Sequence, residues 1–163
     1  MNEMLLQYAC YNQWANNKLL DVLREIPDEV LDTEAASSFN SLRKTVYHTW
    51  GAEDVWLQRI QLVANPAPVA IGFIGTFADA CDQWQSTSRM LAQMAGQTDE
   101  ILNRPIAYRD FKGNPWETPL AEILHHVFNH GTHHRGQMIT MLRQMGATEI
   151  PATDFIAYVR LKK

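Results

Sequence analysis

Residues 124–137 read LHHVFNHGTHHRGQ and contain five of the six histidines in the chain. If this stretch is helical, His126, His130 and His134 share one stripe, because each step of four residues turns an α-helix by about 400°. Apolar residues such as Ile123 lie on the same stripe, so the histidines point toward an apolar surface. A row of imidazoles in that position is unusual enough to require a specific cause.

Metal coordination is the cause that this spacing favours. Imidazole is the commonest protein ligand for zinc-like ions, and two His that are four residues apart can bind one ion from successive turns. All three cannot, because residues 126 and 134 are about 12 Å apart along the axis whereas metal–nitrogen bonds are about 2.1 Å long. The ion must take His130 with either His126 or His134, and spacing leaves both pairs open. Gln137 lies one turn beyond His134, where it could bind a ligand or a metal-bound water, and this slightly favours the second pair.

His48 is the candidate for the third ligand. It shares one face of a predicted helix with Thr45, Ala52, Val55, Trp56, Arg59 and Leu62. Three His ligands leave coordination positions open, as in catalytic rather than structural zinc sites. An open position could hold a water that the ion acidifies, or a substrate thiolate. Besides Gln137, His126 is a candidate to support the ligands; the ordinary alternative is that these histidines are surface or core side chains without a metal.

Length and composition fit one globular domain that spans residues 1–163. The chain is 46% hydrophobic and 20% charged and has a net charge of −4, which are ordinary values for a protein with a buried core. No run of Lys or Arg offers an electrostatic footprint for nucleic acid. No apolar run has membrane-spanning length, and the polar start MNE lacks the basic leader of a signal peptide. We therefore expect a cytoplasmic protein that binds neither nucleic acid nor membrane.

Hydrophobic spacing of three and four residues predicts four long helices and a short final one. Their expected ranges are residues 2–25, 40 or 41 to 63, 76–95, 119–145 and 154–161. The residues expected to end the four long helices are Pro27, Pro66, Gly96 and Gly146. Thr118 is expected to cap the last long helix, with Pro119 at its first position.

Two segments between these helices are not predicted to be long helices. Residues 28–39 read as a loop with a short turn. Residues 104–116 read as a short β-hairpin or extended loop that could cover one end of the bundle, because KGNP at 112–115 is typical of a turn. Four long amphipathic helices predict an all-α four-helix bundle, in which side chains of facing helices can build an interior metal site.

Several charged residues have weaker claims to a role. Glu53 and Asp54 follow His48 closely but lie off its face, so we interpret both as salt-bridging surface residues rather than as bases. Arg135 is interpreted as a surface or interface ion-pair residue rather than as a substrate-anion contact. Arg59, on the face of His48, could hold a substrate carboxylate or form an ion pair in the bundle.

The remaining tryptophan, histidine and cysteine residues are not expected to bind the metal. The tryptophans should pack in the core or at a dimer interface, although Trp56 could line a pocket. His125 should be solvated, and His133 should lie near the ligands or at an interface. Cys10 and Cys81 are interpreted as buried thiols rather than as a disulfide or a metal-binding pair.

The motifs of the chain resemble the DinB-like (YfiT-like) family of metal-dependent proteins. These motifs are NHGTHHRGQ at 129–137, continued by LRQMG at 142–146, YNQWAN at 11–16, and LRKTVYH at 42–48 with Trp56 downstream. The resemblance spans nearly the whole chain and preserves order and spacing. It implies a four-helix bundle with one divalent ion, held by His48 from the second helix and by His130 and His134 from the fourth.

The resemblance also implies a function. Relatives in the wider superfamily include thiol-dependent S-transferases and a mycothiol-dependent maleylpyruvate isomerase, whose metal activates a low-molecular-weight thiol, and members are often homodimers. We therefore expect a homodimeric metalloenzyme with one divalent transition metal, zinc or nickel above all. Its metal would activate a small thiol or water for transfer to, or hydrolysis of, an electrophilic small-molecule substrate.

Two other interpretations stay open. The chain lacks the HExxH helix, the Gly-rich phosphate loop and the GxSxG elbow, and it offers no clear general base. A non-catalytic metal-binding stress-response or sensor protein that acts as a homodimer is therefore the main alternative, and a metal enclosed by Trp and Phe side chains would favour it. A purely structural metal is the other, and it predicts a large loss of thermal stability on chelation.

Overall fold

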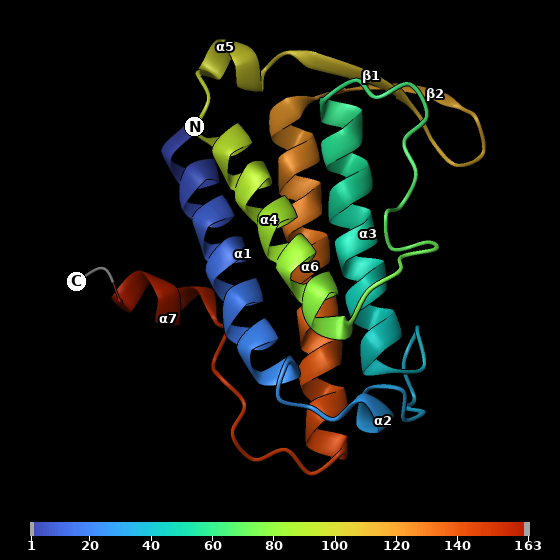
Figure 1. The fold of residues 1–163 in the computed structure, drawn as a ribbon. Coiled ribbons are helices and arrows are strands. Elements are labelled where there is room, and N and C mark those ends of the chain that lie inside the picture. Colours follow the sequence, from blue (N-terminus) through green and yellow to red (C-terminus); the bar gives the residue numbers. More distant parts are fainter. Residues whose placement is uncertain (1, 162–163) are drawn as a thin grey trace.

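The computed structural model describes residues 2–161, in which four long helices pack side by side (Figure 1). The long helices are α1 (Asn2–Leu23), α3 (Leu42–Ile60), α4 (Phe77–Ala95) and α6 (Leu120–Gln144). The shorter elements are α2 (Asp28–Leu31), α5 (Asp99–Leu102), α7 (Phe155–Arg160) and the strands β1 (Pro105–Arg109) and β2 (Pro115–Pro119). The all-α four-helix bundle predicted from the sequence is confirmed.

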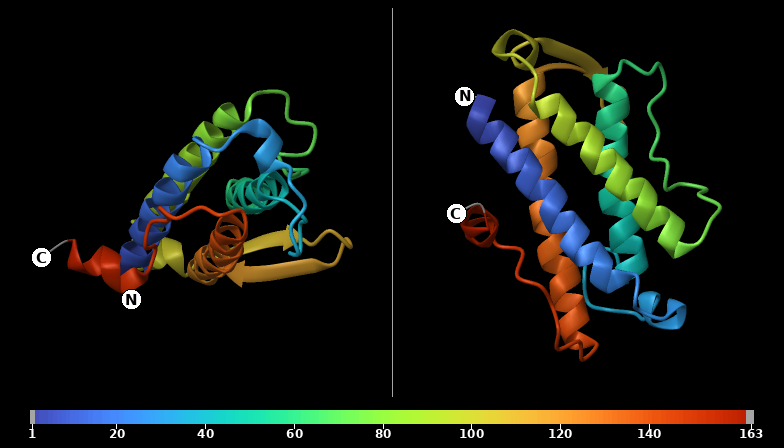
Figure 2. Two further views of the ribbon diagram at one scale, coloured as in Figure 1. Left: turned by 90° about the horizontal axis from the view of Figure 1, so that it is seen from below. Right: turned by 60° about the vertical axis from the view of Figure 1, so that its left-hand side comes forward.

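The order of the helices differs from a simple up-and-down bundle. α1 packs against α4 and α6, and α3 packs against the same two helices, so the cyclic order is α1–α4–α3–α6. α3 and α4 run in the same direction, whereas α1 and α6 both run in the opposite one (Figure 1, Figure 2). Consecutive helices that are parallel need a long connection. Residues 61–76 provide it by running back along the outside of α3 (Figure 1).

Local sequence signals set several helix ends. Ser41 caps α3, because its hydroxyl accepts a hydrogen bond from the backbone N–H of Lys44 (3.3 Å). Thr76 and Asp79 form a reciprocal capping box at the start of α4. Just beyond the end of α6, Gly146 adopts φ +87°, the left-handed conformation that a glycine accepts at no steric cost.

Three details differ from the prediction. Thr118 does not cap α6, because it lies in β2 opposite Ile106, and α6 begins at Leu120 without a side-chain cap. α3 ends at Ile60 rather than near residue 63, and Leu62 adopts φ +59° as the chain leaves the helix. The sequence pattern does not predict α5, since four residues are too few to show a helical period.

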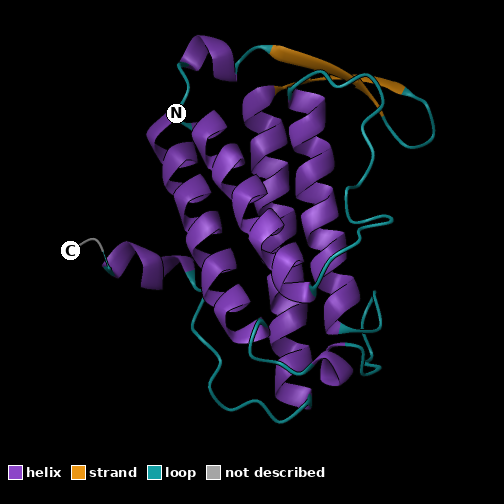
Figure 3. Cartoon of the chain, viewed as in Figure 1, coloured by secondary structure: helices purple, strands orange, loops and turns teal. Residues whose placement is uncertain are grey.

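The predicted β-hairpin is confirmed and lies across the ends of α3 and α6 (Figure 3). β1 and β2 are antiparallel, with Tyr108 opposite Trp116. In the turn between them, the carboxylate of Asp110 accepts hydrogen bonds from the backbone N–H groups of Lys112 and Asn114, both 2.9 Å long. The Asp110 side chain thus stabilises the turn, which projects sideways past the helices (Figure 2).

Apolar side chains fill the bundle in two clusters, one toward each end. Trp50 and Trp84 are buried in the cluster farther from the hairpin, as expected, whereas Trp116 is 56% exposed on the hairpin. Both cysteines are free thiols, although Cys10 is only partly buried, and burial raises the pKa of the Cys81 thiol to about 11. Within residues 2–161, no helix combines the length and the apolar character needed to cross a membrane.

A buried polar network separates the two apolar clusters and links all four long helices. Arg135 of α6 donates from Nη1 to the side-chain oxygens of Asn12 (2.6 Å) and Asn16 (2.7 Å) on α1. Both asparagines donate in turn to Oε1 of Glu53 on α3 (3.2 and 3.0 Å). Ser88 of α4 donates to the other oxygen of Glu53 (2.6 Å). The side-chain amides of Asn12 and Asn16 therefore bridge the buried guanidinium of Arg135 and the buried carboxylate of Glu53.

The interpretation of Glu53 and Arg135 as surface residues is wrong. Their exposed fractions are 0% and 1%. Burial raises the pKa of the Glu53 carboxyl, while its hydrogen-bond donors and the charge of Arg135 oppose that rise. Asp54 also forms no ion pair in the described part of the chain; it is half-buried and accepts hydrogen bonds from Gln58 and from the backbone of Val69.

Gly131 allows α6 to approach α1 at this network. A Cβ atom at position 131 would lie 2.9 Å from Oδ1 of Asn12 and 3.1 Å from Nη1 of Arg135. Those two atoms are hydrogen-bonded to each other, so neither can move without breaking the network. Gly136 lies on the same helix, but a Cβ there would meet no heavy atom within 4 Å.

We predict that alanine has opposite effects at these two glycines. Gly131→Ala should lower the free energy of unfolding by about 1–3 kcal/mol, because the added methyl overpacks the network. Gly136→Ala should raise it by about 0.5–1 kcal/mol, because alanine is the better helix former where space is free. Urea unfolding followed by circular dichroism measures both, and a stabilised Gly131→Ala variant would contradict the close approach.

We further predict strong coupling between Arg135 and Glu53. Arg135→Met should cost about 3–5 kcal/mol, because it leaves Glu53 buried without its compensating charge. The double variant Arg135→Met/Glu53→Leu should lose clearly less than the sum of the two single variants, by about 0.5–3 kcal/mol. A double-mutant cycle in urea tests this, and additive losses would show that the two residues act independently.

Candidate metal centre

The structure brings His48, His130 and His134 together between two facing helices. His48 lies on α3, and the other two lie one turn apart on α6. The Nε2 atoms of His48 and His130 are 3.2 Å apart, and those of His130 and His134 are 3.0 Å apart. One ring nitrogen from each of the three residues lies within 4.8 Å of the other two. Imidazoles from distant parts of the chain therefore converge on one point.

These separations fit a shared divalent ion. Two nitrogens that are each about 2.1 Å from one ion lie about 3.0 Å apart at a right angle and about 3.4 Å apart at the tetrahedral angle. Zinc, nickel and other first-row ions accept imidazole ligands. Within the described residues, no further His, Cys, Asp or Glu joins the cluster. The three histidines are positioned to hold one metal ion and would leave part of its coordination sphere to other ligands.

Gln137 orients one of the three rings. Its Oε1 lies 2.7 Å from Nδ1 of His134, and its Nε2 donates to the hydroxyl of Ser38 (3.2 Å). Because an amide oxygen only accepts hydrogen bonds, Nδ1 of His134 must carry the proton and Nε2 must keep its lone pair for a metal. Gln137 thus lies beside a candidate ligand, as expected, and its effect on metal binding stays a prediction.

His126, the other candidate supporting residue, lies outside the cluster. Its ring packs edge-on against Trp56, with centroids 5.4 Å apart, and its centroid is 6.1 Å from that of His130. No hydrogen bond joins His126 to any of the three converging histidines in residues 2–161. His125 is exposed, as expected, and the exposed ring of His133 lies against that of its neighbour in the cluster.

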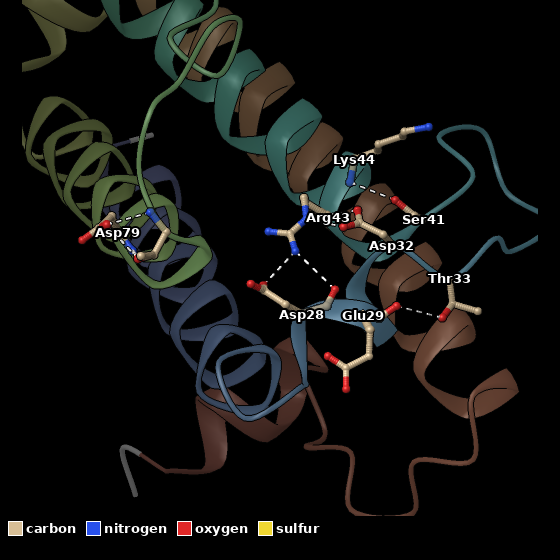
Figure 4. A network of polar contacts seen from close by, with 9 residues as sticks. Asp28, Glu29, Asp32, Thr33, Ser41, Arg43, Lys44 and Asp79 are labelled. Carbon is tan, nitrogen blue, oxygen red and sulfur yellow. Dashed lines mark hydrogen bonds and ion pairs between the residues drawn. The ribbon is translucent and has the colours of Figure 1, made fainter.

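The loop between α2 and α3 adds an aromatic wall to the site. Phe39 stacks on the ring of His48, with centroids 3.9 Å apart and the planes inclined by 21°. Arg43, in the first turn of α3, donates to the carboxylates of Asp28 (2.8 Å) and Asp32 (2.9 Å) and so ties α2 to α3 (Figure 4). Helical periodicity gives no signal for Phe39, because it lies in the loop that precedes α3.

The surroundings hold the three imidazoles in the neutral, metal-binding form. Burial, followed by the proximity of His134, lowers the pKa of His48 to about 4. Burial and the neighbouring histidines lower the pKa of His130 to about 3, and burial also lowers the pKa of His134. A metal binds only unprotonated ring nitrogens, so these neutral imidazoles can bind one without first losing a proton.

A cavity of about 290 Å³, here called the α3 cavity, adjoins the histidine cluster. Its lining includes His48, Ala52, Val55, Trp56 and Arg59 of α3 and Phe111 of the hairpin turn. Pro68 and Ile71, from the connection between α3 and α4, form part of its opposite wall. The largely apolar face that carries His48 therefore looks into this cavity, and Trp56 lines it, as the sequence allowed.

Known proteins are similar to this chain in sequence and in fold. The sequence matches the DinB family over residues 1–162. The chain belongs to the DinB family. It is 28% identical to Protein DinB of Bacillus subtilis (strain 168) over the whole chain and 98% of that protein, and 29% identical to uncharacterized protein YrdA of the same organism over 78% of this chain and 74% of that one. The crystal structure of a DinB-like protein from Bacillus cereus ATCC 10987 matches with a TM-score of 0.69 and 29% identity, covering 92% of this chain and 95% of that one.

In this DinB-family protein, residues 129–137 contact two neighbouring helices, α3 and α1. His130 and His134 face the candidate metal position beside α3. The residue that follows each of them, Gly131 or Arg135, faces the polar network on α1. The same short motif therefore builds the histidine cluster and fixes the helix that carries it.

We predict that Gln137→Ala weakens zinc and nickel binding by about 10- to 100-fold, because loss of a ligand's hydrogen-bond partner frees its ring and its tautomer. Competition against a chromophoric chelator measures the affinity. Thr140→Ala is the matched control, since Thr140 lies about one turn farther on α6 and its hydroxyl donates to the backbone oxygen of Gly136 rather than to a histidine ring. Wild-type affinity in the Gln137→Ala variant would contradict this role.

Proposed function

We propose that this DinB-family protein is a metal-dependent enzyme that transfers a small thiol to, or hydrolyses, an electrophilic small molecule. The observation that carries the proposal is the sharing of His48 between the histidine cluster and the α3 cavity. A group bound beside the three histidines and a molecule held in that cavity would be neighbours. Proximity of this kind is a large part of catalysis in bimolecular reactions.

The histidines, Gln137 and the cavity residues would each have a separate role in this reaction. His48, His130 and His134 would hold the ion through Nε2, and Gln137 would keep the ring of His134 oriented. A divalent ion bound there would supply Lewis acidity and lower the pKa of a coordinated thiol or water toward neutrality. The apolar side chains of the α3 cavity would hold the electrophile beside the ion.

Phe39 supports the alternative of a non-catalytic metal-binding protein. Its ring covers that of His48 at a centroid distance of 3.9 Å and lies 5.6 Å from that of His134. An ion enclosed on that side would exchange its ligands less readily. The α3 cavity favours the enzyme, because a closed sensor or structural site has no need of a pocket beside its ligands.

Three further expectations remain proposals: a single domain, a cytoplasmic location and a homodimer. For the homodimer, support comes from large apolar side chains that α7 and α1 leave exposed, including Phe155 and Ile156 on α7 and Met4 on α1. Apolar side chains gathered at a surface often mark a protein–protein contact. Analytical ultracentrifugation of the purified protein distinguishes the dimer from the monomer.

We predict that activity depends on the three histidines. The protein, stripped of metal and reloaded with zinc or nickel, should transfer cysteine to chlorodinitrobenzene or hydrolyse nitrophenyl acetate. Loss of a ligand's hydrogen-bond partner typically lowers activity by about 10- to 100-fold. His134→Ala removes a ligand itself, so the rate should fall by more than that. Metal content by mass spectrometry should fall in parallel.

The control is His125→Ala, which removes an exposed histidine from the same helix. It should keep both metal content and rate. A full rate in His134→Ala, or a rate that survives chelation, would exclude the metalloenzyme. Stoichiometric metal with no turnover of any thiol or ester substrate would favour the non-catalytic alternative.

A further inference from the structure

Arg59 occupies the end of the α3 cavity that is farther along the helix from His48. Its exposed fraction is only 7%. Its guanidinium carbon lies 4.4 Å from the ring centroid of Trp56, 5.1 Å from that of Tyr108 and 5.2 Å from that of Phe111. Three aromatic faces therefore hold the cation in place by cation–π attraction.

This buried cation has no carboxylate partner in residues 2–161. Nη2 donates to the backbone oxygen of Arg109 (3.2 Å), and Nε is buried without a hydrogen-bond partner among the described residues. The nearby acid is Asp110, whose two oxygens are already occupied by donors of the hairpin turn, including Asn114 and Trp116. The guanidinium thus keeps donor capacity that the fold itself does not use.

The guanidinium lies where two cavities meet. The second, here called the hairpin cavity, measures about 440 Å³ and is lined by Arg59, Leu62, Val63, Ala107, Tyr108 and Trp116. Arg59 is among the residues that line both cavities. A small molecule in either space would therefore lie beside the Arg59 side chain.

The α3 cavity sets the direction and the size of a ligand. Positions 48 and 59 are separated by about 16 Å along the helix axis, and helical side chains lean toward the N-terminus, which brings the guanidinium back toward His48. The wall between the two ends is largely apolar, with Ala52, Val55 and Trp56. A volume near 290 Å³ is at the small end of ligand pockets, which run from about 300 Å³ upward.

We infer that Arg59 binds the carboxylate of a small amphiphilic organic acid whose apolar part lies in the α3 cavity toward His48. The planar guanidinium matches a carboxylate through charge-assisted hydrogen bonds, and the stacked aromatic rings leave its N–H edge free to donate. Burial lowers the pKa of this guanidinium, although the charge of Asp110 opposes that change, so a bound anion would further stabilise the buried cation. If the proposed function holds, the reactive end of such a substrate faces the histidines; the carboxylate site itself does not depend on that function.

The test compares octanoate with its neutral analogue octanamide. In chelator-treated wild-type protein, calorimetry should show octanoate binding about tenfold more tightly or better, and Arg59→Gln should remove that difference while leaving octanamide unchanged. Arg109→Gln is the matched control, because this exposed arginine of β1 donates its side chain to the backbone oxygen of Gly113 and is not among the residues that line the α3 cavity. Equal octanoate affinity in wild-type protein and Arg59→Gln would overturn the inference.

A second measurement covers the case in which Arg59→Gln does not fold. Octanoate should shift the Nε–H cross-peak of Arg59 in the nitrogen–proton correlation spectrum of the wild-type protein, with the peak assigned by its loss in Arg59→Lys. A cross-peak that stays in place at saturating octanoate would overturn the inference.

The outcome also separates this site from the metal. His134→Ala, without metal, should bind octanoate as wild-type protein does. Binding that needs added zinc and disappears in His134→Ala would place the carboxylate on the metal and overturn the role of Arg59. If the metal-loaded wild-type protein binds octanoate but transfers no thiol, only the proposed function is rejected.

Discussion

A carboxylate and a guanidinium buried in one bundle constrain all the helices around them. Glu53 and Arg135 are not in direct contact in this fold; Asn12 and Asn16 connect them, each amide accepting from the guanidinium and donating to the carboxylate. Such a network stabilises a fold only when every member is satisfied. It therefore fixes the rotation and the height of α6 against α1 and α3. Because His130 and His134 lie next to network positions on α6, the same constraint sets where their rings meet His48.

Much of the site follows from spacing. Histidines four residues apart on an apolar stripe, together with one histidine on an apolar face of another helix, suffice to nominate His48 and His130 with either His126 or His134. Helix ends can also be predicted from the sequence where a single residue has a specific backbone role, as with the cap of Ser41 and the left-handed Gly146. The family motifs then decided between two histidine pairs that geometry left open.

Other features depend on contacts between distant segments, which periodicity does not encode. A charged residue in a helix is by default assigned to solvent, and the partners of Glu53 lie 35 to 41 residues away in the sequence. The available signal was indirect: Asn12 and Asn16 interrupt the apolar stripe of α1 one turn apart, and Gly131 stands within a helix. The parallel course of α3 and α4 and the position of Phe39 had no signal of their own, because both follow from the paths of loops.

The connection of residues 61–76 has a consequence for how proteins of this kind diversify. It forms one wall of the α3 cavity, through Pro68 and Ile71, yet it contributes none of the three converging histidines. Loops tolerate substitution and insertion far better than packed helices do. Selection can therefore remodel what the cavity admits while the ligand cluster and the buried network remain untouched. In this architecture, one wall of the cavity lies on a different stretch of chain from the three histidines.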